Sequence, residues 1–152
     1  MSRLAGVCAL LLLAACLPAW TQELRIAADV QRPETYAPDR LATLPTGDVQ
    51  AAREGSATTT DTGPGLWPLI EVAKPVDGPA KDVHLQHGLL ARGADGYAVA
   101  LPLAELDPSF TGKQVIIALK QDAAALAAPR LDVPGDRRAG RDVRDLVAIE
   151  IH

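Results

Sequence analysis

Cysteine is almost missing from this chain of 152 residues, because its only two cysteines, Cys8 and Cys16, both lie near the start. A domain built from the rest of the chain therefore has no disulfide to brace it. The same absence excludes thiolate catalysis and thiolate metal ligation in that domain. Ordinary apolar packing must hold the fold, and a hydrophobic content of 48% is enough for a globular core.

Aromatic residues and positive charge are scarce as well. Aromatic side chains make up 3% of the chain, which leaves little to build a surface for stacking bases. The net charge is −4, whereas nucleic-acid binding takes most of its affinity from a basic face. We therefore expect no nucleic-acid partner. The phosphate loops G-x-x-x-x-G-K-[ST] and G-x-G-x-x-G and the G-x-S-x-G nucleophile elbow are absent too.

The first apolar run indicates export. Arg3 precedes the uncharged, mostly apolar residues 4–17, a run as long as a signal-peptide core and shorter than a transmembrane helix. We expect a signal peptide over residues 1–21 and a single folded domain over residues 22–152. The expected location is the periplasm.

Two cleavage positions fit this leader. Leu13-Ala14-Ala15-Cys16 resembles a bacterial lipobox, which would place the cut near 15/16 and a lipid on Cys16. Ala19-Trp20-Thr21 has the small-x-small form of an ordinary signal-peptidase site, with the cut near 21/22. The mature protein is thus either lipid-anchored or soluble, and membrane contact is expected only through such an anchor.

Periodicity and turn residues predict a β-rich α+β fold in a single domain with two or three short helices. Short helices with proline near one or both ends are expected within 37–45, 66–75 and 102–110. The segment DTGPG (61–65) predicts a turn, and ADGY (94–97) predicts a hairpin. Strands are expected at 24–30, in pieces within 48–60, and at 81–93, 97–103, 114–120, 131–133 and 143–151.

A pair of histidines, His84 and His87, has the spacing H-x-x-H. Residues three apart share a face of a helix, but they point to opposite faces of the strand expected here. No third ligand lies nearby in the sequence, and the terminal His152 adds none. We therefore expect no metal site.

An arginine cluster is the one unusual feature of this acidic chain, with five arginines between residues 130 and 144. Two interpretations remain open. The segment is either a solvated loop with weak internal ion pairs or an anion site, since guanidinium forks fit phosphate and carboxylate. The candidate anion-binding residues are Arg138, Arg141 and Arg144.

The order of three segments carries a family resemblance. GADGYAVALPLAELDP (93–108), QVIIALKQD (114–122) and LDVPGDRRAGRDVRDLVAIEI (131–151) together resemble the oxidoreductase molybdopterin-binding domain of the sulfite oxidase type, from about Leu24 to the end. The resemblance implies a largely β fold around a pterin cleft. It also implies that Arg141 and Arg144 lie near the phosphate of the cofactor.

Two departures from the family pattern shape the functional hypothesis. Catalytic members bind molybdenum through a cysteine in the loop before the helix at 66–75, and residues 51–65 contain none. The turn glycine expected after Asp122 is Ala123. We therefore expect a short, degenerate member with no catalytic residues and no metal.

The functional expectation is an exported, non-catalytic, molybdopterin-binding-like domain that binds a small anionic ligand or a partner protein. No cofactor is expected to be retained, and molybdopterin is the one that the resemblance implies. The alternatives are a molybdopterin-dependent oxidoreductase, or a subunit of one, and a structural envelope lipoprotein.

Overall fold

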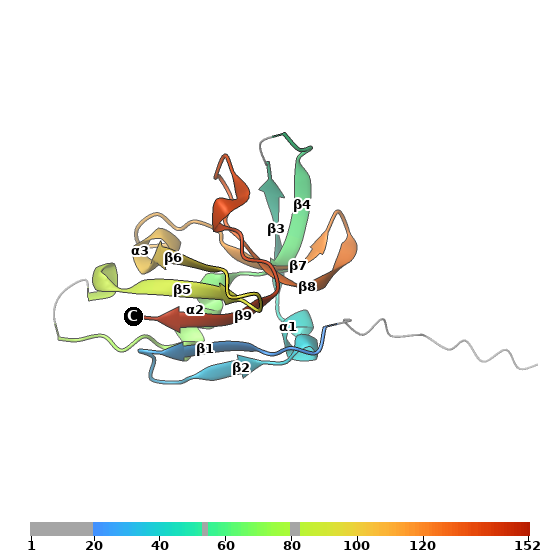
Figure 1. Cartoon of the computed structure of the whole chain (residues 1–152). Helices are drawn as coiled ribbons and strands as arrows, with labels where there is room; N and C mark the ends of the chain where they lie inside the picture. The colour runs from blue at the N-terminus through green and yellow to red at the C-terminus, as the bar shows by residue number, and fades with distance from the viewer. Residues whose placement is uncertain (1–19, 53–54, 80–82) are drawn as a thin grey trace, which may run out of the picture.

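A computed structural model describes residues 20–52, 55–79 and 83–152. The strands of these residues form two sheets (Figure 1). The first has the order β2-β1-β9-β5-β6, and its strands are β1 (Leu24–Ala28), β2 (Glu34–Tyr36), β5 (Gly88–Gly93), β6 (Ala98–Pro102) and β9 (Leu146–Ile151). The second has the order β3-β4-β7-β8, and its strands are β3 (Thr46–Ala51), β4 (Thr59–Pro64), β7 (Ile116–Gln121) and β8 (Ala124–Asp132).

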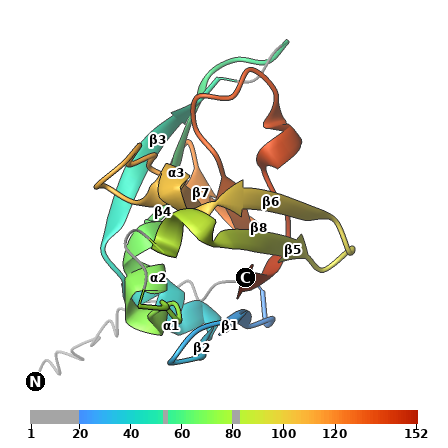
Figure 2. The same ribbon diagram turned by 90° about the vertical axis from the view of Figure 1, so that its left-hand side faces the viewer.

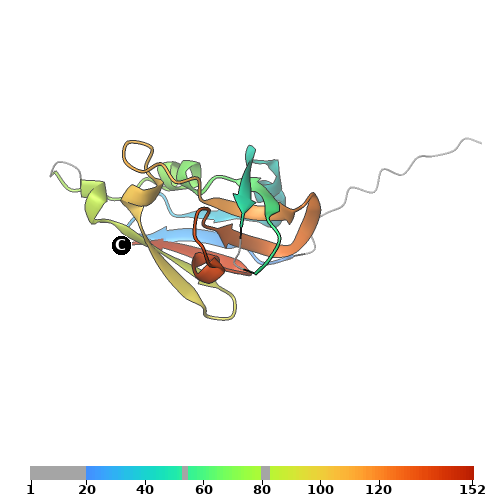
Figure 3. The same cartoon turned by 90° about the horizontal axis from the view of Figure 1, so that it is seen from above.

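The helices are short and lie in the connections. They are α1 (Pro38–Thr43), α2 (Leu66–Ala73), α3 (Leu103–Leu106) and the 3-10 turns η1 (Val83–Gln86) and η2 (Ala139–Arg141). Seen from above, α2 lies behind the first sheet (Figure 3). No helix in the described ranges is long and apolar enough to cross a bilayer. Of the expected α+β class, the β-rich character is what the structure supports.

The first sheet buries one face, and buried and exposed side chains alternate at the start of β1. Leu24 and Ile26 of β1 are fully covered, and Arg25 between them is exposed. The neighbouring strand β9 runs parallel to β1 and places Ile149 beside Ile26. Alternation is therefore clear in β1 and in the second half of β9, where Ile149 and Ile151 are buried, because side chains two residues apart share a face.

Helix α2 covers part of this core as expected. Its buried residues are Leu66, Leu69, Ile70 and Ala73, the apolar stripe that the sequence shows. The helix ends at Lys74, whose φ of 56° is left-handed, and Pro75 follows it. Proline cannot continue the helix, so the predicted stop is confirmed.

Strand β7 is buried on both faces, as its unbroken apolar sequence predicts. Ile117 faces the main core, whereas Ile116 and Ala118 form a second small cluster with Val49 of β3. A strand between two apolar layers needs no polar alternation. This strand therefore ties the second sheet to the rest of the molecule.

Two predicted boundaries are wrong. The segment expected to turn at 61–65 continues β4 to Pro64, because Gly63 lets β4 approach β7. A Cβ at that position would lie 1.9 Å from the Ile117 carbonyl oxygen. The strand expected at 81–93 begins only at Gly88, and η1 precedes it, so His84 lies in a 3-10 turn.

The last strands also differ from the expected bounds. Strand β8 starts at Ala124, well before the expected residue 131, because pairing with β7 recruits an alanine-rich segment without its own strand signal. Strand β9 starts at Leu146, and Val143 forms only an isolated bridge to Leu131. The residues between β8 and β9 make up the arginine loop (residues 133–145).

Candidate functional site

The arginine loop is closed at its base by backbone contacts. Leu131 and Val143 exchange two N–H to carbonyl hydrogen bonds of 2.9 and 3.0 Å. The backbone N–H of Val133 donates to the carboxylate of Asp142 over 3.0 Å. From this base the loop rises above β5 and β6 (Figure 2).

The guanidinium of Arg141 is hydrogen-bonded to two carboxylates of its own chain. Its Nε donates to Asp136 over 2.6 Å, and its Nη1 donates to Glu105 of α3 over 2.9 Å. Lys113 also pairs with Glu105 and lies 3.8 Å from Asp136. We call these four residues the surface ion cluster. Its two cations balance its two carboxylates, so Arg141 brings little uncommitted charge to a ligand.

The pKa values follow from this pairing. Hydrogen bonds from Arg141 hold the pKa of Asp136 below its usual range. Burial alone raises the pKa of Glu105, but hydrogen bonds and charges of Lys113 and Arg141 outweigh it, and the pKa is lowered. Because ion pairs at this exposure contribute modestly, the cluster acts mainly to fasten the arginine loop to α3.

Arg144 lines a different space, a cavity of about 290 Å³. The other residues around this cavity come from the β5–β6 hairpin, β8 and the arginine loop, and are Asp95, Tyr97, Arg130, Ala139 and Asp142. Arg141 is not among them. The two arginines that the resemblance implies near one phosphate therefore border different environments. The structure leaves their anion-binding role as a prediction.

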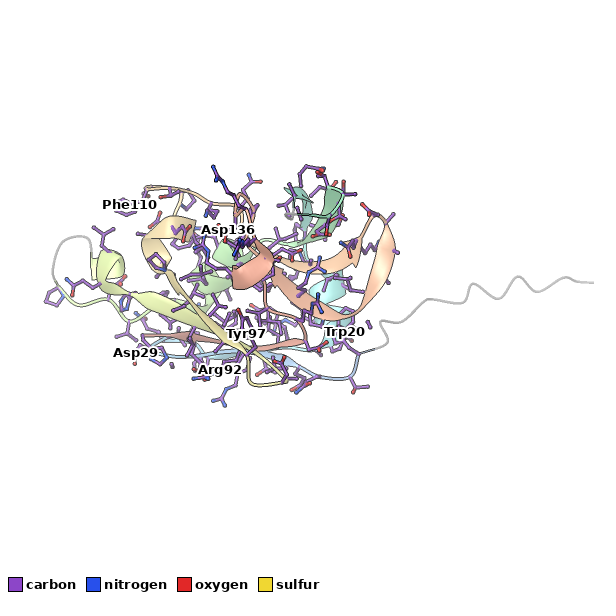
Figure 4. The ribbon with its side chains drawn as sticks, turned by 45° about the horizontal axis from the view of Figure 1, so that its top comes forward. Trp20, Asp29, Arg92, Tyr97, Phe110 and Asp136 are labelled. Carbon is purple, nitrogen blue, oxygen red and sulfur yellow. The ribbon has the colours of Figure 1, made fainter. Side chains whose placement is uncertain are left out.

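Tyr97 fixes one wall of the cavity. Its hydroxyl donates to the carbonyl oxygen of Gly140 over 2.7 Å, which ties the β5–β6 hairpin to the arginine loop (Figure 4). The predicted hairpin at 94–97 is present, with Gly96 at a φ of 87°. Beneath it, a Cβ at Gly93 would lie 2.6 Å from the carbonyl oxygen of Arg144. Glycine at position 93 is thus what lets the backbone of Arg144 approach.

Arg130 joins the cavity to a buried charge cluster. Its Nε donates to Asp132 over 2.6 Å, and its Nη2 donates to Asp61 of β4 over 2.8 Å. Both carboxylates are almost fully covered, with exposures of 0% for Asp61 and 2% for Asp132. We call these three residues the buried triad. One cation therefore stands between two buried carboxyl groups.

Keeping two buried carboxylates charged beside each other costs free energy. Burial raises the pKa of Asp132 to about 7, and Asp61 adds to this rise, whereas Arg130 opposes it. Near neutral pH the Asp132 carboxyl is therefore protonated part of the time. The sequence pattern missed this cluster, since Asp61 stands in a segment typical of a turn. The available signal was an aspartate between two apolar residues at 131–133.

Arg138 borders a second, smaller cavity of about 20 Å³ together with Asp132, Asp142 and the end of β3. That volume suits about one water molecule, not an organic ligand. Arg144, in contrast, lines a cavity near the size of a small ligand site.

His87, the second residue of the H-x-x-H pair, has two neighbours among the described residues. The ring of His87 lies with Nδ1 3.2 Å from the carbonyl oxygen of His152 and Nε2 3.3 Å from Asp77. The Nε2 contact is within ion-pair distance but lacks hydrogen-bond geometry. Among the residues that the structure describes, no three His, Cys, Asp or Glu side chains are grouped so that they could hold a metal ion.

The molybdenum part of the family cofactor does not fit this chain. The segment that would supply the thiolate becomes the β3–β4 hairpin and the approach to α2, and residues 17–152 contain no cysteine. The cavity beside Arg144 also carries Asp95 and Asp142, which offset the charges of Arg130 and Arg144. This lining differs from a purely basic pocket for a pterin phosphate.

No protein-family model and no curated protein matches the chain. Among solved structures, it is similar to the crystal structure of the sulfane dehydrogenase SoxCD from Paracoccus pantotrophus, with a TM-score of 0.69 and 19% identity. The match covers 86% of this chain and 38% of that chain, so this chain spans well under half of its neighbour. At this identity the likeness shows a shared fold alone, and it agrees with the β-rich fold that the sequence predicts.

Proposed function

We propose that this protein is an exported, non-catalytic domain of the oxidoreductase-like fold that binds a small anionic ligand in the cavity beside Arg144. The observation that carries the proposal is the placement of Arg144 beside Tyr97 on the wall of a cavity of about 290 Å³, in a domain whose residues 17–152 contain no thiol. A guanidinium fork at the rim suits a phosphate or carboxylate.

The lining also defines what the ligand carries besides its anion. Asp95 and Asp142, which also line the cavity, are hydrogen-bond acceptors. A ligand with a phosphate at one end and hydroxyl or amine donors at the other satisfies both kinds of group. The volume lies at the lower end of ligand sites, which run from about 300 Å³ upwards, so the ligand is small.

Calorimetric titration of the purified protein with glycerol phosphate and with inorganic phosphate tests the site. Arg144→Ala is expected to weaken binding by about tenfold or more, since a charge-assisted contact contributes about 1.5–3 kcal/mol. Arg137→Ala is the matched control, an exposed arginine of the same loop that does not line the cavity. Equal affinity in both variants contradicts the proposal.

A double variant tests the pair that the family resemblance implies. If Arg141 also serves the ligand, Arg141→Ala with Arg144→Ala weakens binding beyond Arg144→Ala alone. We expect no such addition, because Arg141 is held by Asp136 and Glu105. All affinities are compared at two salt concentrations, because screening weakens exposed charge contacts.

A molybdopterin-dependent oxidoreductase, or a subunit of one, is the second candidate, and the fold likeness to a sulfane dehydrogenase favours it. Metal analysis separates the two. Protein exported from a host that makes the cofactor is expected to contain far less than one molybdenum per chain. Near-stoichiometric molybdenum, or a molybdenum(V) signal in paramagnetic resonance, overturns the non-catalytic proposal.

The proposed location is the periplasm. The leader over residues 1–19 lies outside the described residues, so export is argued from its sequence alone. The third candidate, a structural envelope lipoprotein, differs from the first in needing no ligand. It therefore predicts no binding of either phosphate compound.

A further inference from the structure

Trp20 is part of the folded core, although it lies at the end of the leader. Its side chain is 8% exposed and belongs to the same apolar cluster as Leu24 and Ile26 of β1. Figure 4 places it at the α1 end of the molecule. A tryptophan contributes one of the largest apolar surfaces of any residue, so its removal from a core leaves a large void.

The two cleavage motifs of the leader treat this residue differently. A cut after Thr21 removes Trp20 from the mature chain and opens the core beside β1. A cut between Ala15 and Cys16 keeps it. No disulfide is available to offset such a loss, because the domain contains no cysteine beyond position 16.

We propose that the leader is cut before Trp20, at the Ala15–Cys16 bond, so that the mature protein begins with a lipid-bearing Cys16. The proposal rests on the export proposed above and decides between its soluble and anchored forms. The proposal is based on the burial of Trp20 in the core. Of the two cleavage motifs, the lipobox is the one whose cut keeps Trp20 in the mature chain.

The modification has a defined chemical balance. The Cys16 sulfur displaces the phosphorylated headgroup of a diacylglycerophospholipid, so a carbon–sulfur bond forms and a carbon–oxygen bond breaks. The thiol proton leaves with the headgroup phosphate. Water then hydrolyses the Ala15–Cys16 amide and frees the amino group of Cys16. Two acyl chains give stable anchoring, which a single chain does not.

The anchor would hold the domain close to the membrane. From Cys16 to Trp20 the chain advances four residues, and an extended chain spans at most about 3.5 Å per residue. Trp20 then lies within about 14 Å of the modified cysteine. The α1 end of the domain, where Trp20 packs, would face the bilayer.

Stability measurements test the core role without any export. In the full chain, Trp20→Ala is expected to lower Tm by roughly 10 °C or more, and Trp20→Phe by much less. Phe110→Ala is the matched control, an aromatic residue that is 44% exposed near the opposite end of the molecule (Figure 4). A Tm for Trp20→Ala within 2 °C of that of Phe110→Ala overturns the premise.

Processing is tested on the full chain exported by a bacterium with lipoprotein machinery. Intact mass is expected to show a chain that begins at Cys16 and carries lipid, with fatty-acid label that Cys16→Ser abolishes. A mature chain that begins at Gln22, or one that keeps Met1, overturns the proposal. Retention of Met1 also contradicts export itself, whereas a start at Gln22 leaves export and the ligand proposal intact.

Discussion

Two charge clusters in this molecule each pair arginine with carboxylates, but the carboxyl pKa values shift in opposite directions. In the surface ion cluster, Arg141 and Lys113 match two carboxylates, and those carboxyl pKa values are lowered. In the buried triad, one arginine serves two carboxyl groups, and burial raises the pKa of Asp132 to about 7. Charge balance and burial, not composition, decide whether a cluster fastens the fold or titrates within the physiological range.

The largest expected effect comes from removing the shared cation of the buried triad. Arg130→Met removes the guanidinium that bonds both Asp61 and Asp132 and is expected to cost about 3–5 kcal/mol in the free energy of unfolding. The loss is expected to be greater at pH 8 than at pH 5, where protonation relieves the repulsion. Urea unfolding at both pH values measures it. Arg130→Lys, which keeps the charge but not the fork, is the control and falls between.

The second-largest expected effect is a change in the free energy of unfolding with pH, caused by the raised pKa of Asp132. The pKa of Asp132 is about 7 in the folded protein, above the usual value of about 3.9 in an unfolded chain. The folded state binds more protons between these values, so the free energy of unfolding falls as the pH rises from about 4 to about 7. The change is on the order of a few kcal/mol. Asp132→Asn is expected to remove this slope, and an unchanged slope in that variant contradicts the assignment.

The surface ion cluster responds to pH in the opposite direction. Because the pKa values of Asp136 and Glu105 are lowered, their stabilisation is present above the usual carboxyl pKa and is lost as the pH falls through their own pKa values. Acid titration of the free energy of unfolding below pH 4 reports this loss.

The smallest effect is expected from Arg141→Ala. The side chain of Arg141 is 32% exposed, so the free energy of unfolding should fall by about 1 kcal/mol or less, and by less still at high salt. Arg137→Ala, in the same loop, provides the baseline for an exposed arginine. A loss as large as that of Arg130→Met would remove the distinction between the two clusters.

Local signals predicted many of the elements. The helix at Leu66–Ala73 and the strand at Ile116–Gln121 follow from apolar spacing, because a 3.6-residue period and an unbroken apolar run each suit one environment. The departure at Ala123 also has a structural counterpart. Its φ is 66°, a left-handed conformation in which glycine is strain-free and alanine is not.

The candidate site was harder to predict because its partners are distant in sequence. The resemblance pointed to Arg141 and Arg144, but Glu105 lies 36 residues before Arg141 and takes its guanidinium. Asp61 lies 69 residues before Arg130 and is buried against it. No local sequence pattern predicts such a pair, because the residue types around Asp61 fit a turn as well as they fit a buried ion pair.

The sequence by itself determined the absence of a thiol from residues 17–152 and much of the apolar pattern of the strands, because these depend on residue types and short spacings. Tertiary structure alone decided which arginine borders the cavity, which aspartate titrates and whether Trp20 is core or leader. Those outcomes depend on burial and on charges brought together from distant strands. Burial and long-range proximity are properties of the folded chain.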